Sequence, residues 1–223
     1  MHSDTIDPQL AALAATLKVL ARWAPHARHD VLGACSPISL DLSVLGVKAA
    51  KGPLSVGDIN PFINRAKANV KNVVQQLDRM VLFQRQDRRP RIAVSDVMER
   101  MAHSMHTVFS SVAWQAADEA GALGSESEYD LTLTVLAVVL ALFDKHGANK
   151  TLNIVAGRDQ DELRLTFWVA PAIDEGWVAA SAEVPASQRI TIEEAQHLAC
   201  HLDFVFSTQE NGITLRRTAA NDG

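Results

Sequence analysis

Apolar side chains in the N-terminal part of the chain recur at alternating steps of three and four, and this spacing constrains the fold more than any other feature. One run has the apolar positions Ile59, Ile63, Ala66, Val70, Val73, Leu77 and Met80. Two earlier runs lie on either side of Pro25: the first has the positions Leu10, Leu13, Leu17, Leu20 and Ala24, and the second has Arg28, Val31, Cys35, Ile38, Leu42 and Leu45. Spacing kept over about three heptads is typical of helices in a bundle or coiled coil.

The runs at 28–45 and 59–80 predict an antiparallel helical hairpin. They are separated by the stretch KAAKGPLSVGD (residues 48–58), which favours a turn. A two-helix hairpin cannot cover both of its apolar seams, so we expect a second copy to complete a dimeric four-helix bundle. Pro25 lies between the runs at 10–24 and 28–45 and predicts a kink or break there. The placement of the segment before Pro25 stays open.

The pattern changes at the polar stretch Gln86–Arg91, which contains Pro90 and is taken as a linker. Residues 1–88 are therefore predicted to be a helical hairpin domain and residues 89–223 a second domain. In the second domain the sequence predicts helices near 95–109, 129–145 and 191–200, a short strand at 112–114, and strand hairpins at 151–169 and 203–217. Helices interleaved with antiparallel hairpins indicate an α+β sandwich.

Composition excludes several classes of function. The net charge of −5 argues against a general nucleic-acid binder. The N-terminal residues do not resemble a signal peptide, and the apolar run Leu131–Phe143 is too short to cross a bilayer. We therefore expect a cytoplasmic protein with no membrane partner. Cys35 and Cys200 lie in apolar helical patterns, so we expect buried free thiols in a reducing compartment.

The segment Arg28-His29-Asp30 is the best candidate for chemistry. Arg28 lies on the apolar seam, so His29 falls one step past it, on the outer flank of the helix. An exposed histidine can present a ring nitrogen to a partner, and histidine side chains are largely neutral and nucleophilic near neutral pH. The Asp30 carboxylate is placed to orient the ring or to hold a proton during group transfer. This segment predicts His29 as a nucleophile.

The run HDVLGACSPI (residues 29–38) resembles the phospho-acceptor box of histidine kinases. His29, Asp30, Val31 and Ile38 match that box, whereas Ala34 stands where the family usually has proline and Pro37 is an addition. The order of elements after the hairpin also resembles the ATP-binding module of these kinases. The ending ITIEEAQHLACHLDFVFSTQENGITLRR (residues 190–217) is similar to the end of that module.

The nucleotide equipment of such a kinase is missing from the sequence. Ala137 and Ala141 stand where the resemblance leads us to expect asparagines that hold magnesium and phosphate. After the strand LRLTFWV, the stretch 170–176 replaces the expected Asp-x-Gly-x-Gly loop, with one glycine and a displaced aspartate. The second domain is thus expected to be a degenerate ATPase-like sandwich, with ATP binding weak or absent.

A kinase-like dimer with its acceptor histidine and no nucleotide site resembles the bacterial pseudo-histidine-kinase phosphotransferases of the ChpT-like type. The resemblance implies a phosphorelay in which His29 takes a phosphoryl group from one response-regulator receiver domain and passes it to another. It implies no cofactor of the chain's own, because the receiver supplies magnesium and the acidic pocket. The receiver would dock around His29, where Gly33 leaves room and Arg28 and Arg79 attract acidic groups.

Other interpretations remain open. Glu99, His103 and His106 share a helical face, and so do Glu193, His197 and His201, but neither group has a further ligand placed by the sequence, and we expect no metal site. There are two alternatives to the phosphotransferase. The chain could be a divergent ATP-dependent histidine kinase, or a non-catalytic kinase-like scaffold in which His29 is an ordinary surface residue. The sequence does not name the donor or acceptor receivers.

Overall fold

The computed structural model describes residues 7–82, 91–105, 111–116, 123–147, 150–159, 162–171 and 184–218. Their contacts divide the chain into two compact units, Leu20–Arg88 and the combination of Met1–Val19 with Arg89–Gly223. We call the first the hairpin unit and the second the α/β unit. These units differ from the predicted domains, 1–88 and 89–223, in the first 19 residues, which contact the second part of the chain.

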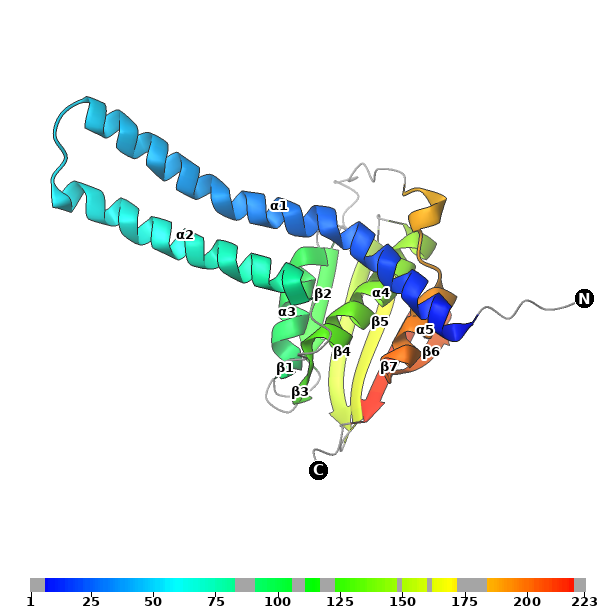
Figure 1. The fold of residues 1–223 in the computed structure, drawn as a ribbon. Helices are drawn as coiled ribbons and strands as arrows, with labels where there is room; N and C mark the ends of the chain where they lie inside the picture. Colours follow the sequence, from blue (N-terminus) through cyan, green and yellow to red (C-terminus); the bar gives the residue numbers. More distant parts are fainter. Residues whose placement is uncertain are drawn as a thin grey trace, which may run out of the picture. The chain divides into compact units, whose positions relative to one another are not determined.

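The hairpin unit consists of two long antiparallel helices, as the seams predict. Helix α1 spans Pro8–Ala50 and helix α2 spans Val56–Leu82 (Figure 1). Arg65 of α2 makes a two-pronged contact with Asp41 of α1, with Nη2 donating to Oδ1 at 2.7 Å and Nε to Oδ2 at 3.1 Å. The Phe62 ring lies 4.6 Å from the Arg65 guanidinium carbon and 5.2 Å from the Lys48 ammonium. These contacts fix how the two helices are aligned.

Of the two outcomes predicted at Pro25, a kink or a break, the break is absent. Helix α1 is a single element that contains both Pro25 and Pro37. A proline inside a helix loses one backbone hydrogen bond and crowds the preceding turn. Here α1 has tertiary contacts on both sides of Pro25, through buried residues between 11 and 19 and through Asp41 in the hairpin. Packing at both ends therefore outweighs the local preference for a break.

The first part of α1 also buries a different face from the one the leucines suggested. Leu10, Leu13 and Leu17 are 61%, 56% and 59% exposed. The buried residues of this segment are Ala11, Ala12, Ala15 and Val19, each at most 8% exposed. Small side chains let a helix approach its neighbour closely, so the alanine face lies inward and the leucine seam is left outside.

The α/β unit contains one five-stranded mixed sheet with the strand order β2-β4-β5-β7-β6. The strands of this sheet are β2 (Ser111–Ala116), β4 (Lys150–Asp159), β5 (Glu162–Pro171), β6 (Val205–Gln209) and β7 (Gly212–Thr218). Strand β2 runs parallel to β4, and the other neighbours are antiparallel. A separate two-stranded sheet pairs β1 (Arg91–Ala93) with β3 (Ser125–Ser127). The α+β class and both predicted strand hairpins are confirmed.

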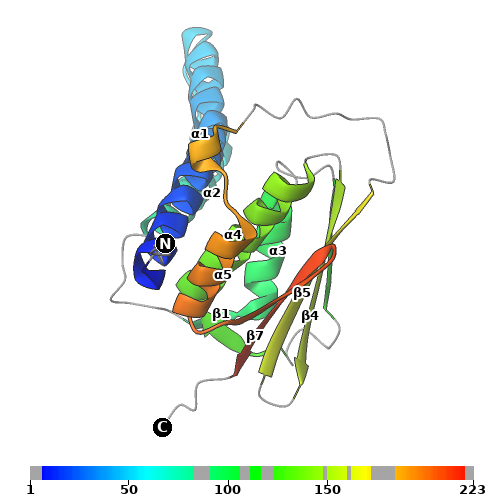
Figure 2. The ribbon, with the colours of Figure 1, turned by 90° about the vertical axis from the view of Figure 1, so that its right-hand side faces the viewer.

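Three helices, α3 (Val94–Met105), α4 (Glu128–His146) and α5 (Ile192–His201), cover one face of the five-stranded sheet (Figure 2). Helix α4 is buried along nearly its whole length, as its composition predicts. The core of the unit also contains Leu152, Ile154 and Phe167 of the sheet, all fully buried. In the β6–β7 turn, Gly212 lies so close to β5 that a Cβ atom would sit 2.5 Å from the Phe167 carbonyl oxygen. The Asn-Gly turn therefore needs glycine at this position.

Two expectations from composition are modified. Cys35 is half-buried and Cys200 is exposed, so the predicted burial of the thiols is wrong for Cys200. Within the described residues, Val31–Ala50 of α1 is long and apolar enough to cross a membrane, judged by length and composition alone. None of this segment is buried in the chain. Polar residues interrupt its apolar ones, so the sequence shows no long apolar run there.

Candidate functional site

His29 lies in the part of α1 that belongs to the hairpin unit, and its side chain is exposed. Arg28, its neighbour in the chain, is exposed as well. Gly33, Ser36 and Leu40 follow at steps of four, three and four, so they share the helical face of His29. This face carries a nucleophilic side chain, a glycine one turn on, and Leu40, which is 65% exposed. A second protein can therefore reach the imidazole without moving any part of the helix.

A Cβ atom at Gly33 would meet no atom of the described residues within 4 Å. Gly33 therefore has no packing partner in that part of the chain. The predicted role of Gly33 is to leave space for a partner beside His29. The open space around Gly33 is compatible with this role.

Replacing Gly33 with alanine is expected to raise stability by about 0.5–1 kcal/mol, because alanine has less backbone freedom to lose in a helix. Thermal unfolding of the purified protein measures this effect. The phospho-acceptor resemblance further implies that replacing Gly33 with arginine leaves folding intact but slows phosphoryl transfer from a receiver. Loss of stability in Gly33→Ala would contradict the absence of neighbours.

Two other predicted site residues are placed only by their backbone. Asp30 lies in α1, directly after His29, and Arg79 lies in the last turns of α2. The side chains of both fall outside the described part of the structure. The structure therefore brings Arg28, His29 and Gly33 together on consecutive turns of one helix. It leaves the predicted roles of Asp30 and Arg79 as predictions.

The helix that would carry nucleotide ligands in a kinase is closed to solvent at the expected positions. Ala137 and Ala141 of α4 are 0% and 1% exposed. A methyl group offers no oxygen to a metal ion or hydrogen bond to a phosphate. Of the stretch 170–176, only Ala170 and Pro171 at the end of β5 are described. The part of this stretch expected to contact adenine lies outside the described residues.

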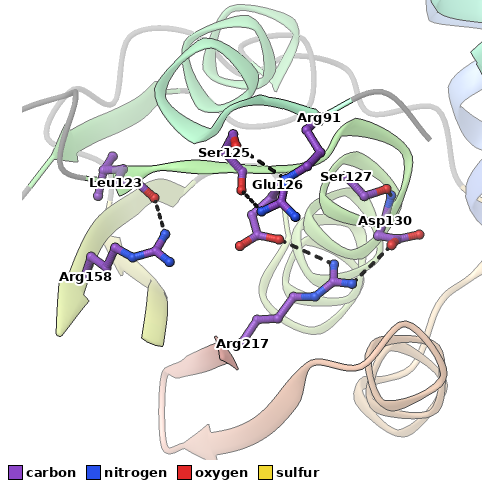
Figure 3. A network of polar contacts seen from close by, with 8 residues as sticks. All are labelled: Arg91, Leu123, Ser125, Glu126, Ser127, Asp130, Arg158 and Arg217. Atoms are coloured by element: carbon purple, nitrogen blue, oxygen red, sulfur yellow. Dashed lines mark hydrogen bonds and ion pairs between the residues drawn. The ribbon is translucent and has the colours of Figure 1, made fainter. Parts of the chain in front are cut away.

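Figure 3 shows a buried ion network that no sequence pattern indicated. Glu126 of β3 and Asp130 of α4 are 4% and 1% exposed, and both lie beside Arg217 of β7. Arg217 Nη2 donates to Asp130 Oδ2 at 3.3 Å, and Arg217 Nη1 lies 3.9 Å from Glu126 Oε2. Burial raises the pKa of Glu126 above its ordinary value, against the opposing charge of Arg217. Asp130 and Arg217 are 87 positions apart, so no local pattern reveals the pair.

Two further arginines donate hydrogen bonds to backbone carbonyls at the two-stranded sheet of β1 and β3. Arg158 Nη1 donates to the Leu123 carbonyl oxygen at 2.9 Å, and Arg91 Nη2 donates to the Ser125 carbonyl oxygen at 2.8 Å (Figure 3). Gly124, between these two carbonyls, has a φ of 71° and lies against the Arg158 guanidinium. The network therefore joins β1 and β3 to the five-stranded sheet, and we assign it a structural role.

The two histidine groups weighed as metal sites receive no support from the geometry. His197 Nε2 lies 3.9 Å from Glu193 Oε1 on α5, a weak pair at the surface. Within the described residues there is no cluster of three or more His, Cys, Asp or Glu side chains arranged to hold a metal. The side chains of His103 and His106 lie outside that part of the chain.

No known protein-family profile matches the chain, and no curated protein matches it. Among solved structures, a histidine kinase from Burkholderia phymatum STM815 is 14% identical with a TM-score of 0.40, covering 92% of this chain and 98% of that one. A bacterial phosphotransferase is 12% identical with a TM-score of 0.40, covering 90% and 95%. Histidine kinase ThkA in complex with the response regulator TrrA is 10% identical with a TM-score of 0.38, covering 90% and 61%. We draw no conclusion about activity from similarities at this level.

Proposed function

We propose that this chain is a histidine phosphotransferase that relays a phosphoryl group between response-regulator receiver domains through His29. The observation that carries the proposal is an exposed histidine on an uninterrupted helix, followed by Asp30 and beside a glycine with open space around it. The phospho-acceptor resemblance of residues 29–38 supplies the reaction class. The exposure of His29 supports it, because the donor is a separate protein that has to reach the ring.

In the proposed reaction this chain supplies only the nucleophile and its orientation. A lone pair of an imidazole nitrogen of His29 attacks the phosphorus of the receiver's aspartyl phosphate, and the bond from phosphorus to the aspartate oxygen breaks. The receiver's carboxylate takes the electron pair of the broken bond. Transfer to the second receiver is the same step in reverse. The helix contributes by holding the ring in a position for in-line attack, which is an effect of orientation rather than of acid or base strength.

The alternative of an ATP-dependent kinase is disfavoured by α4. A kinase of the resembling type needs oxygen or nitrogen ligands on this helix, and Ala137 and Ala141 are buried apolar side chains in the domain core. We propose that the α/β unit has kept the architecture without the nucleotide chemistry. The chain then needs no cofactor of its own, and the receiver domain brings the magnesium.

We also propose that two copies pair through their hairpin units in the cytoplasm. Large apolar side chains on α2 are exposed at exact intervals of seven, which places them on one helical face: Val56, Ile63, Val70 and Leu77. Their exposed fractions run from 42% to 73%. On α1, Leu32, Leu40 and Leu42 are 56–65% exposed. Soluble monomers rarely expose apolar surface on this scale, and a second hairpin would cover it in a two-fold symmetric bundle.

Placing two charges on this face is expected to separate the dimer. The wild-type chain should sediment at about twice its mass of 24.2 kDa, and the double variant Ile63→Asp, Val70→Asp should sediment as a monomer. Lys71→Asp is the matched control, because Lys71 is already exposed and polar.

A wild-type monomer, or a double variant that stays dimeric, would contradict the proposed pairing. If the wild type instead floats with lipid vesicles, the apolar segment Val31–Ala50 binds or crosses a membrane. The experiment that tests the relay itself is transfer of label from phosphorylated receiver domains to the protein, with ATP alone in a parallel reaction.

A further inference from the structure

Strand β6 (Val205–Gln209) is an edge strand of the five-stranded sheet, with β7 as its neighbour (Figure 1). An edge strand presents a row of backbone N–H and C=O groups to any other strand that approaches it. Four of the five residues of β6 are exposed. Val205, at its start, is 52% exposed. The backbone of this edge is therefore open to another strand.

The hydrogen bonds of β7 decide which of its residues bond to each neighbouring strand. The Val169 amide of β5 donates to the carbonyl oxygen of Asn211, the residue before β7, at 3.0 Å. Hydrogen-bonded and non-bonded pairs alternate along an antiparallel ladder. The odd-numbered residues of β7, beginning with Ile213, therefore bond to β5. Its even-numbered residues bond to β6.

This alternation decides which groups of β6 face outward. Ser207 lies opposite Thr214, an even-numbered residue of β7, so the backbone groups of Ser207 point into the sheet. The Ser207 hydroxyl also donates to the Thr214 carbonyl oxygen at 3.3 Å. Its neighbours Phe206 and Thr208 then direct their N–H and C=O groups away from β7. Among the described residues, these outward groups have no hydrogen-bond partner.

Strand β6 lacks the features by which proteins usually keep an edge strand from pairing. Those features include a charged side chain, a proline or a bulge. The sequence Val-Phe-Ser-Thr-Gln contains no charged residue and no proline. Its pairing with β7 runs through five consecutive positions without a bulge. The edge is therefore a regular template for another antiparallel strand.

We propose that β6 is a docking edge for β6 of a second copy of this chain. An antiparallel pair centred on Ser207 sets Phe206 opposite Thr208 of the second copy, and the reverse. Both residues point outward, so every outward N–H group of one strand meets a C=O group of the other. A pair centred on Phe206 would instead set Thr208 opposite Phe204. The Phe204 amide is already used, because it donates to a carbonyl oxygen of α5 at 2.9 Å.

The side chains of the pair centred on Ser207 are also compatible with a second copy. On one face of the sheet, Phe206 lies across from Thr208 of the other copy, and aromatic and β-branched side chains stabilise each other across strands. On the other face, Val205 lies beside Gln209 of the other copy. Neither strand carries a charged side chain, so no like charges are opposed. The contact has two-fold symmetry and closes on itself.

This contact is expected to be weak. Two strands of five residues bury less surface than the about 1,200–2,000 Å² of a stable protein interface. Association through β6 should therefore appear only in concentrated solution. The inference depends neither on the proposed phosphotransfer nor on pairing through the hairpin units.

Sedimentation of the double variant Ile63→Asp, Val70→Asp tests the contact with hairpin pairing removed. Its average mass should rise by up to about twofold from dilute to concentrated solution, as two copies associate. Adding Thr208→Pro should abolish this rise, because proline removes an outward donor that the sheet does not use. Thr208→Ala is the matched control, since alanine keeps the amide, and its mass should still rise. Circular dichroism checks that both variants remain folded.

Hydrogen exchange measured by NMR gives a second readout. The Phe206 and Thr208 amides should exchange rapidly in dilute solution and at least about threefold more slowly in concentrated solution. The Ser207 amide, bonded to β7, should exchange slowly in both.

Three results would each overturn the docking edge. These are an average mass that does not rise with concentration, a rise that persists in Thr208→Pro, and slow exchange of the Phe206 and Thr208 amides in dilute solution. The rise is measured against the dilute sample of the same variant, so it does not depend on whether the hairpin units pair. Failure of label transfer to His29 would count only against the relay.

Discussion

Arg217→Met is expected to destabilise the α/β unit by about 3–5 kcal/mol at pH 7, which is close to the whole stability of many domains. The reason is that Arg217 is the cation in contact with two buried carboxylates, Glu126 and Asp130. Methionine fills a similar volume but supplies no charge, so both carboxylates lose this partner. Urea unfolding followed by circular dichroism measures the loss.

Arg216→Met is the matched control for this variant. Arg216 is the preceding residue of β7, and its 3.9 Å pair with Glu162 lies at the surface, with side chains 45% and 36% exposed. A pair of this kind contributes about 0–1 kcal/mol. Equal effects of the two variants would show that the buried network is not what stabilises this end of the sheet. Adding Glu126→Gln to Arg217→Met should recover part of the loss, because one of the two buried carboxylates that lose Arg217 is replaced by a neutral group.

The network also has a predictable pH dependence. Burial raises the pKa of Glu126 in the folded state above its ordinary value of 4.5. Between the ordinary and the raised pKa, the folded protein binds more protons than the unfolded chain, so the contribution of Glu126 to stability falls as pH rises through this window. In Arg217→Met the opposing positive charge is gone and the pKa rises further. The difference between this variant and the parent should therefore be smaller in mild acid than at pH 7.

His29→Gln is expected to lose phosphoryl transfer from receivers completely, because the variant lacks the nucleophile. Glutamine retains a polar side chain of similar reach, and His29 is exposed, so stability should change by no more than about 0.5 kcal/mol. His201→Gln is the control, since His201 is also exposed on a helix but belongs to the α/β unit. Transfer that persists in His29→Gln would assign the acceptor to another residue.

Local patterns were sufficient to predict most elements of this fold, but not the short strands β1 and β3. The three-four spacing gave both long helices, and the Asn211-Gly212 turn gave the last strand hairpin, where Gly212 proves to be sterically required. These features depend on residues close together in the chain. The continuous helix through Pro25 depends instead on contacts far from the proline, at both ends of α1. A local rule therefore predicted a break where tertiary packing prevents one.

Two other features could not be read from the sequence because they depend on distant partners. The alanine face of α1 is buried because Lys18 and its neighbours meet α5, 176 positions away. The regular spacing of Leu10, Leu13 and Leu17 had predicted burial of a different face of α1. In the same way, the Arg217 network joins residues from β3, α4 and β7. Each member is an ordinary charged residue when the sequence is considered alone.

The candidate site was predicted only in part by physical reasoning. Periodicity placed His29 on the outer side of its helix, and the structure confirms its exposure. Spacing alone gives no reason to prefer His29 over other exposed histidines, such as His201. The preference came from the resemblance of residues 29–38 to a phospho-acceptor box.

The most direct measurement is transfer of radiolabelled phosphoryl groups to the purified protein from a panel of phosphorylated receiver domains, with labelled ATP and magnesium in a parallel reaction. We expect label to arrive from at least one receiver on the wild type and on His201→Gln, none to arrive on His29→Gln, and ATP alone to label nothing. Label from ATP alone would make the protein a kinase. Absence of label from every receiver in a panel drawn from the same cell would contradict the relay and favour a non-catalytic scaffold.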